Sequence, residues 1–96
     1  MELFIFARFH AREGRESDVA AMLREVAAPS REERGCLALQ FFRSIRDPRL
    51  FYLHSRWADE AAFELHAELP HTVRFLEQVP TLLDHPLDIT RTMPFE

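Results

Sequence analysis

The chain has 96 residues, enough for one domain, and its 47% hydrophobic and 29% charged residues are typical of a globular protein. The formal net charge is −4 and there is no basic run, so neither nucleic acids nor anionic membranes are expected as partners. We therefore expect a single domain spanning residues 1–96. A domain this small buries only about two thirds of its unfolded surface, so an apolar surface shared with a partner would stabilise it.

The cellular compartment is suggested by the cysteine content and by the N-terminus. Cys36 is the only cysteine, so no internal disulfide can form, as is usual in a reducing compartment. No apolar stretch is long enough to span a membrane, and residues 1–10 lack the features of a signal peptide. We expect a cytoplasmic protein with no membrane association.

The first predicted element is a strand at residues 4–10, because bulky side chains alternate along it. One face carries Leu3, Ile5, Ala7 and Phe9. The other face carries Phe4, Phe6, Arg8 and His10. An amphipathic helix should follow within residues 12–28, where Val19, Met22, Leu23 and Val26 form one apolar stripe. Pro29 is expected to kink or end that helix.

The second half of the chain begins with a predicted hairpin. Residues 36–44 and 49–57 have the character of strands, and the Asp47–Pro48 pair between them indicates a turn. Residues 58–69 then predict a helix capped by Asp59. Pro70 should interrupt it before a short helix at 71–79, and residues 86–93 predict a last strand.

The predicted order is β-α-β-β-α-β, a ferredoxin-like α+β fold with a four-stranded antiparallel sheet and helices on one face. The open face would be unusually apolar, because it would carry several of Phe4, Phe6, Phe42 and Tyr52. Apolar patches of this kind rarely stay exposed in a soluble monomer. We therefore expect a homodimer in which two sheets pack face to face.

The sequence GCLALQFFRSIRDPRLFYLHSRWADEAAFELHAELPHTVRF resembles the antibiotic biosynthesis monooxygenase family, whose members include quinol-monooxygenase-like proteins. The resemblance extends from Phe4 to about residue 90. It rests on an acidic residue and Gly-Cys-Leu opening a strand, an Asp-Pro turn, a Trp closing the next strand, an Ala-rich helix ending in His, and a following Pro-His. The matching residues are Glu33, Gly35, Cys36, Leu37, Asp47, Pro48, Trp57, Asp59, Ala61, Ala62, His66, Pro70 and His71.

The resemblance implies a dimeric α+β barrel and, for some members, oxygenation of quinol-like or polycyclic aromatic compounds with O2 and no flavin, haem or metal. Other members degrade haem or isomerise a small phosphorylated sugar-like signal. Two positions depart from the family pattern. Ser55 stands where the family commonly has Glu, and Ala7 stands where haem-degrading relatives have Asn. The first departure removes a negative charge that would serve the helix histidine, and the second weakens a haem-degrading function.

His66 is the leading catalytic candidate, because it lies on the apolar stripe of its predicted helix and should point at the sheet. It would enter an apolar slot that suits a planar phenol or quinol. Histidine titrates near neutral pH and could take the phenolic proton, and the resulting anion could react with O2. The predicted substrate-binding residues are Trp57 as the pocket wall, Ser55, His71, Phe51, Leu53, Ile5, Ala7 and Phe9.

Simpler interpretations stay open for both histidines of this region. His66 could be a core residue hydrogen-bonded to Ser55 or Tyr52. His71 could lie at the pocket mouth or simply pack on Pro70. A metal site is not predicted, because five positions rotate the two rings roughly 140° apart on a regular helix, although Pro70 could alter that angle. In addition, no Cys or Asp/Glu set in the sequence completes a site around them.

Three functions are therefore weighed. The first is a cofactor-independent monooxygenase acting on an aromatic hydroxyl compound, with no cofactor or metal. The second is an isomerase or lyase of a small polar metabolite, which would need a pocket lined by Arg8 or Arg56. The third is a non-catalytic ligand-binding dimer, which Ser55 in place of the family Glu would favour.

Overall fold

The alternation of side chains in β1 (Leu3–His10) separates the two faces of the sheet, as expected. In the computed structural model, which describes residues 1–96, Ile5, Ala7 and Phe9 are 1–2% exposed. Phe6, on the opposite face, is 53% exposed. β1 has bulky apolar side chains on both faces. One face is buried in the core, and the other face is left exposed.

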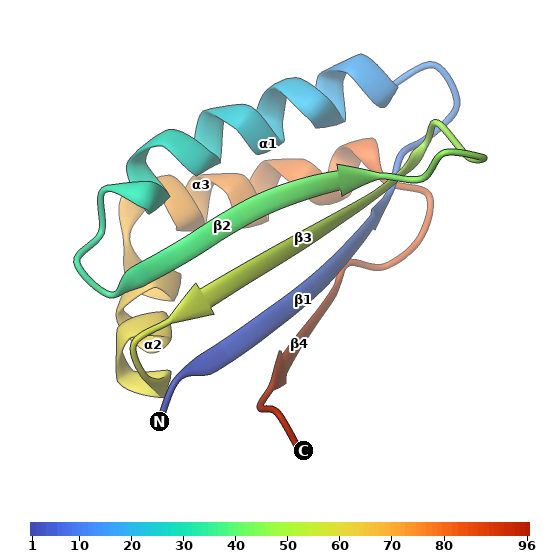
Figure 1. Cartoon of the computed structure of the whole chain (residues 1–96). Coiled ribbons are helices and arrows are strands. Elements are labelled where there is room, and N and C mark those ends of the chain that lie inside the picture. The colour runs from blue at the N-terminus through green and yellow to red at the C-terminus, as the bar shows by residue number, and fades with distance from the viewer.

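The sheet contains β2 (Cys36–Arg43), β3 (Leu50–Trp57) and β4 (Asp88–Thr92) beside β1, in the order β2-β3-β1-β4 (Figure 1). All neighbouring strands are antiparallel. The register pairs Ile5 with Ser55 and Ala7 with Leu53, so side chains predicted to share a slot lie next to each other. On the other side of β1, Arg91 of β4 pairs with Ile5. The predicted ferredoxin-like α+β fold is confirmed.

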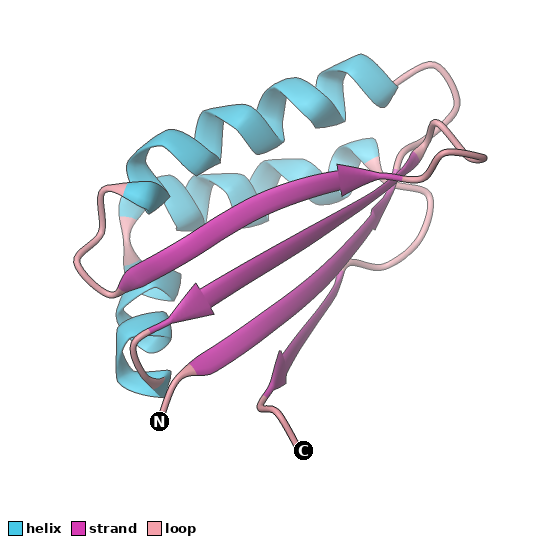
Figure 2. Cartoon of the chain, in the orientation of Figure 1, coloured by secondary structure: helices cyan, strands magenta, loops and turns pink.

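All helices lie on one face of this sheet (Figure 2). They are α1 (Glu16–Arg31), α2 (Glu60–Glu68), α3 (Pro70–Gln78) and the 3₁₀ helix η1 (Val79–Leu82). Pro29 does not end α1, which continues to Arg31. A proline removes only one backbone donor, and the next N–H groups bond backward in tighter turns, Glu32 to Pro29 and Glu33 to Ser30.

The break between α2 and α3 is made by Leu69, whose backbone is extended (φ −74°, ψ 148°). Pro70 then occupies the first helical position, where its missing N–H costs no hydrogen bond. Asp59 caps α2 as predicted, because its carboxylate accepts from the Ala62 N–H at 2.8 Å. The two short helices therefore change direction at one residue, which bears directly on the histidines at 66 and 71.

A cluster of buried hydrophobic residues lies under α1, α3 and η1, at the end of the sheet where β1 finishes. It contains Ala7, Phe9, Ala11, Val19, Ala20, Leu23, Phe51, Phe75, Val79, Leu82 and Leu83. The opposite face of the sheet is open and carries exposed Phe6, Phe42 and Tyr52. His54 packs on Phe6 on this face, with ring centroids 4.9 Å apart. None of the helices combines the length and the hydropathy needed to cross a membrane.

Candidate functional site

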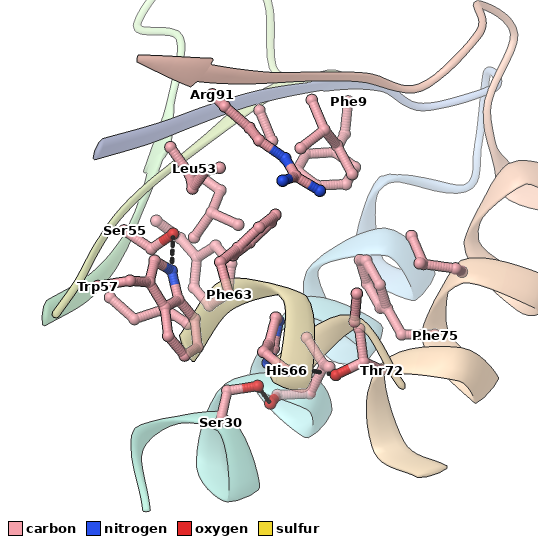
Figure 3. A pocket seen from close by; sticks show the side chains of 18 residues that line it. Phe9, Ser30, Leu53, Ser55, Trp57, Phe63, His66, Thr72, Phe75 and Arg91 are labelled. Atoms are coloured by element: carbon pink, nitrogen blue, oxygen red, sulfur yellow. Dashed lines mark hydrogen bonds between the residues drawn. The ribbon is translucent and has the colours of Figure 1, made fainter. Parts of the chain in front are cut away.

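A cavity of about 300 Å³ lies between the helix-covered face of the sheet and the three α-helices (Figure 3). Hydrophobic residues make up 13 of the 18 that line it, so its walls suit an apolar ligand. Its predicted members are Ile5, Ala7, Phe9, Leu53, Ser55, Trp57 and His66. The predicted slot is thus present as a cavity, with one imidazole in its wall.

Two residues predicted to bind substrate lie elsewhere. Phe51 is buried in the core cluster, with the Arg43 guanidinium 4.5 Å from its ring centroid. It shares a strand face with Trp57, but it lies at the far end of β3, where the core of α1 and α3 fills the space. His71 lines a separate shallow hollow beside Met22 and Arg74 and does not border the cavity.

The cavity is also lined by residues that the sequence pattern did not predict. Phe63 of α2 lies one helical turn before His66, a spacing that places both on one helix face. Thr72, Phe75 and Ser30 come from α3 and α1. Arg91 comes from β4, where it continues the face that carries Ile89. The alternation in residues 86–93 could have predicted this position of Arg91. It places Arg91 on the same face as Ile89, and β4 pairs with β1, which forms part of the cavity wall.

Aromatic rings enclose the His66 imidazole on two sides. The centroid of the Trp57 ring lies 4.4 Å from that of His66, with 36° between the ring planes. The centroid of the Phe63 ring lies 5.6 Å from that of His66. Trp57 and Phe63 pack edge to face on each other at 5.6 Å. The His66 ring is therefore held in one orientation by contacts on α2 and β3.

Ser55 does not bond to His66, contrary to one simpler interpretation of the sequence. Its Oγ accepts a hydrogen bond from Trp57 Nε1 at 3.0 Å, and both residues are buried. Tyr52 lies on the open face and cannot reach His66 either, since neighbouring residues of a strand alternate sides. Ser55 thus fixes the tryptophan wall of the cavity.

The hydrogen-bond partner of His66 is Glu33, which follows α1 in the turn before β2. Glu33 Oε2 lies 2.7 Å from His66 Nδ1 and 2.7 Å from His71 Nε2. Thr72 Oγ1 lies 3.3 Å from the same Nδ1. The side chains of Glu33, His66 and His71 are only 13%, 13% and 19% exposed.

The expectation that the two histidines point apart is wrong, since their ring centroids lie 6.0 Å apart. The angle was that of a regular helix, and the alternative that the break at Pro70 alters it is the one found, since the extended Leu69 resets the helical phase. The expectation that no carboxylate joins them is also wrong. The ligand atoms of Glu33, His66 and His71 lie within 4.8 Å of one another, so these residues could hold a divalent metal ion. His10, Asp84 and His85 form a second, more exposed group of this kind.

Two further charged or reactive groups bear on the chemistry. Arg91 Nη1 donates to Glu64 at 2.5 Å and to Glu60 at 2.7 Å, and these hydrogen bonds raise the pKa of Arg91. The only cavity arginine is therefore already paired with two carboxylates. Burial raises the pKa of the Cys36 thiol, and the Glu33 charge adds to this. Such a thiol is a poor nucleophile, which agrees with a structural role for Cys36.

Fold and site together define a small ferredoxin-like α+β protein with an apolar, aromatic-walled cavity and one inward-facing histidine. The chain belongs to the antibiotic biosynthesis monooxygenase family, whose model matches residues 3–78.

Known relatives agree with this assignment. The Bacillus subtilis (strain 168) protein named "Putative monooxygenase YcnE" is 35% identical over 63 residues, which cover 66% of each chain. The Mycobacterium tuberculosis protein named "Putative monooxygenase Rv0793" is 29% identical over 96% of this chain and 90% of its own length. Its solved structure superposes with a TM-score of 0.94, covering 100% of this chain and 97% of that one. SnoaB of Streptomyces nogalater, a cofactor-independent oxygenase, shares the fold at 15% identity, with a TM-score of 0.88 over 99% of this chain and 94% of its own.

Proposed function

We propose that the protein is a cofactor-independent monooxygenase that oxidises a quinol-like or polycyclic aromatic hydroxyl compound with O2. The observation that carries the proposal is His66, a single imidazole in the wall of an apolar, aromatic-lined cavity of about 300 Å³. Membership of the monooxygenase family supports the reaction class. The description of SnoaB as a cofactor-independent oxygenase supports the absence of a cofactor.

In the proposed reaction, the phenolic hydroxyl of the substrate gives its proton to His66, which acts as general base. The electron-rich anion then reacts with O2. One oxygen atom enters the ring as a carbonyl and the other leaves as water, so that a phenol and O2 give a quinone and water. The substrate supplies all four electrons, so the balance requires no external reductant. Trp57, Ser55, Leu53, Ile5, Ala7 and Phe9 contribute to binding of the planar ring as wall residues.

The proposal includes a homodimer formed through the open face of the sheet. Phe6, Phe42 and Tyr52 are exposed there on three adjacent strands, which is unfavourable for an isolated subunit. Packing two such faces together would bury them and form the barrel that the family resemblance implies. The single Cys36 fits a reducing compartment such as the cytoplasm, where we place the protein.

The test is oxygen uptake with a panel of quinols and polycyclic phenols, comparing wild type with His66→Ala. Removing a general base should lower the rate by about 100-fold or more. His85→Ala is the matched control, since that ring is exposed and lies outside the cavity. Equal rates in wild type and His66→Ala would exclude His66 as the general base.

The same panel separates the alternative functions. Tight binding of an aromatic compound with no oxygen uptake would support the ligand-binding dimer instead. An isomerase or lyase of a polar metabolite is less well supported, because neither Arg8 nor Arg56 lines the cavity. Arg91 does line it, but Glu60 and Glu64 already neutralise its charge.

A further inference from the structure

We infer that Glu33 is a positioning residue that fixes the tautomer of His66, so that Nε2 is the atom that takes the substrate proton. The inference rests on the proposed role of His66 as base. Glu33 Oε2 lies 2.7 Å from His66 Nδ1. An ionised carboxylate can only accept hydrogen bonds, so Nδ1 must carry a hydrogen. In a neutral imidazole the other nitrogen, Nε2, then has the free lone pair.

The geometry directs that lone pair away from Glu33. His66 lines the cavity, whereas Glu33 does not. Nδ1 faces Glu33 and Thr72, and His66 Nε2 has no hydrogen-bond partner within the chain. Figure 3 shows the His66 ring between Trp57 and Thr72 at the side of the cavity opposite Arg91. The acceptor nitrogen is therefore the one left for a ligand hydroxyl.

His71 holds the carboxylate from a second side. Its Nε2 donates to the same Glu33 Oε2 at 2.7 Å. The two donors come from different helices, α2 and α3, which are joined only through the extended Leu69. Glu33 cannot rotate away from His66 without losing the bond to His71 as well. His71 is thus assigned a positioning role outside the cavity, in place of the substrate contact expected from the sequence.

The backbone around Glu33 is also fixed. Its N–H donates to the Ser30 carbonyl, and its carbonyl accepts from the Cys36 N–H, which ties the end of α1 to the start of β2. The main chain that carries the Glu33 carboxylate is therefore held on both sides of the residue. A pair held in this way needs little rearrangement when a proton is transferred.

Glu33 also supplies the negative charge that is missing at Ser55, where the family commonly has Glu. Serine at that position supplies no charge, and its hydroxyl bonds to Trp57. The negative charge comes instead from Glu33, on a different element of the fold. When His66 takes the substrate proton it becomes an imidazolium, and a carboxylate at 2.7 Å stabilises that charge.

The experiment is nitrogen-15 NMR of histidine-labelled protein, in which long-range proton–nitrogen correlations show which ring nitrogen is protonated. Neutral His66 in the wild type should be protonated at Nδ1. In Glu33→Gln the neutral amide oxygen accepts from Nδ1–H less strongly than the carboxylate does, so the fraction of His66 protonated at Nε2 should rise. Glu32→Gln is the matched control, because it removes the same charge from an exposed neighbour and should leave the spectrum unchanged.

Kinetics supply the second measurement. With a quinol substrate, Glu33→Gln should lower kcat by about 100-fold or more, because no carboxylate then stabilises the imidazolium and part of His66 is protonated at the base atom. KM should change by less than about twofold, because Glu33 does not border the cavity. His71→Ala should lower kcat partially, and His71→Gln, which keeps an N–H donor, should recover part of the loss.

Several outcomes would overturn the inference. These are wild-type His66 protonated at Nε2, an unchanged tautomer and kcat in Glu33→Gln, or loss of wild-type activity on chelation together with a bound metal that His71→Ala loses and His85→Ala keeps, which would indicate that Glu33, His66 and His71 bind metal. If no quinol is oxidised by the wild type, the proposed function fails while the wild-type spectrum still decides the tautomer. If Glu33→Gln does not fold, the wild-type spectrum and the activities of the His71 variants still test the inferred role of Glu33.

Discussion

Ser55 holds the indole of Trp57 through a hydrogen bond of 3.0 Å between Trp57 Nε1 and Ser55 Oγ, both buried beneath α2. The two residues lie two positions apart on β3, so they share one face of the sheet. This hydrogen bond sets the orientation of the ring that packs on His66 at 4.4 Å. The serine that replaces the family glutamate therefore has a defined structural partner.

Ser55→Ala should lower the free energy of unfolding by about 1–3 kcal/mol, because it leaves the buried indole N–H without an acceptor. Urea unfolding followed by fluorescence measures this directly, since Trp57 is the only tryptophan. Ser17→Ala, at an exposed position in α1, is the control and should stay within about 0.5 kcal/mol of wild type. Equal stabilities for the two variants would mean that water or another group satisfies the indole.

Gly35→Ala should destabilise the protein by about 1–3 kcal/mol, because a Cβ at Gly35 would clash with the Cβ of Ala62. Relief of this clash requires α2 to move away from the sheet, and His66 moves with it. We expect loss of thermal stability together with loss of oxygenase activity. The double variant Gly35→Ala/Ala62→Gly removes the clashing atom and should recover part of both. Additive effects of the two changes would contradict the predicted contact.

The pH dependence of stability should reflect His10, which joins the end of β1 to two loops. His10 Nδ1 bonds to Asp84 at 2.6 Å and Nε2 bonds to Asp47 at 2.9 Å. The Asp84 hydrogen bond, followed by that of Asp47, raises the pKa of His10 above its ordinary 6.5. Hydrogen bonds from His10 and His85 lower the pKa of Asp84 to about 2.

A histidine whose pKa is raised in the folded state stabilises the protein fully below pH 6.5, and the contribution is lost as the pH rises through the raised value. The carboxylates contribute above their ordinary pKa of 3.8, and Asp84 loses its contribution as the pH falls toward about 2. His10→Asn should therefore reduce stability more at about pH 5.5 than at about pH 8.5. Urea unfolding at both values checks this, and an equal difference at the two would be the contrary result.

The oligomeric state tests the open face. Light scattering should give the wild type about twice the subunit mass of 11.3 kDa. Phe6→Glu places a charge at the centre of the apolar face and should yield a monomer. Ile45→Glu is the control, since Ile45 is 98% exposed in the β2–β3 turn. A monomeric wild type, or a dimer that both variants preserve, would exclude sheet-to-sheet packing.

Much of the cavity followed from periodicity alone. Side chains that alternate along β1 and β3 must share a face, and the antiparallel pairing of β3 with β1, two strands far apart in the chain, brings Leu53, Ser55 and Trp57 beside Ile5 and Ala7. Periodicity did not predict which residues along β3 reach the cavity. Phe51 has the right face, but the core under α1 and α3 occupies the space in front of it, and a one-strand pattern carries no information on what packs opposite.

The sequence by itself determined the order of elements, the faces of the strands and the inward direction of His66, because these depend on local periods of about 2 and 3.6 residues. Only the tertiary structure decided the partner of His66. Glu33 is 33 residues away in the chain, and His71 reaches it because Leu69 turns α3 back toward the end of α1. The direction of such a turn is set by how helices pack on the sheet, so the meeting of these three side chains depends on the whole fold.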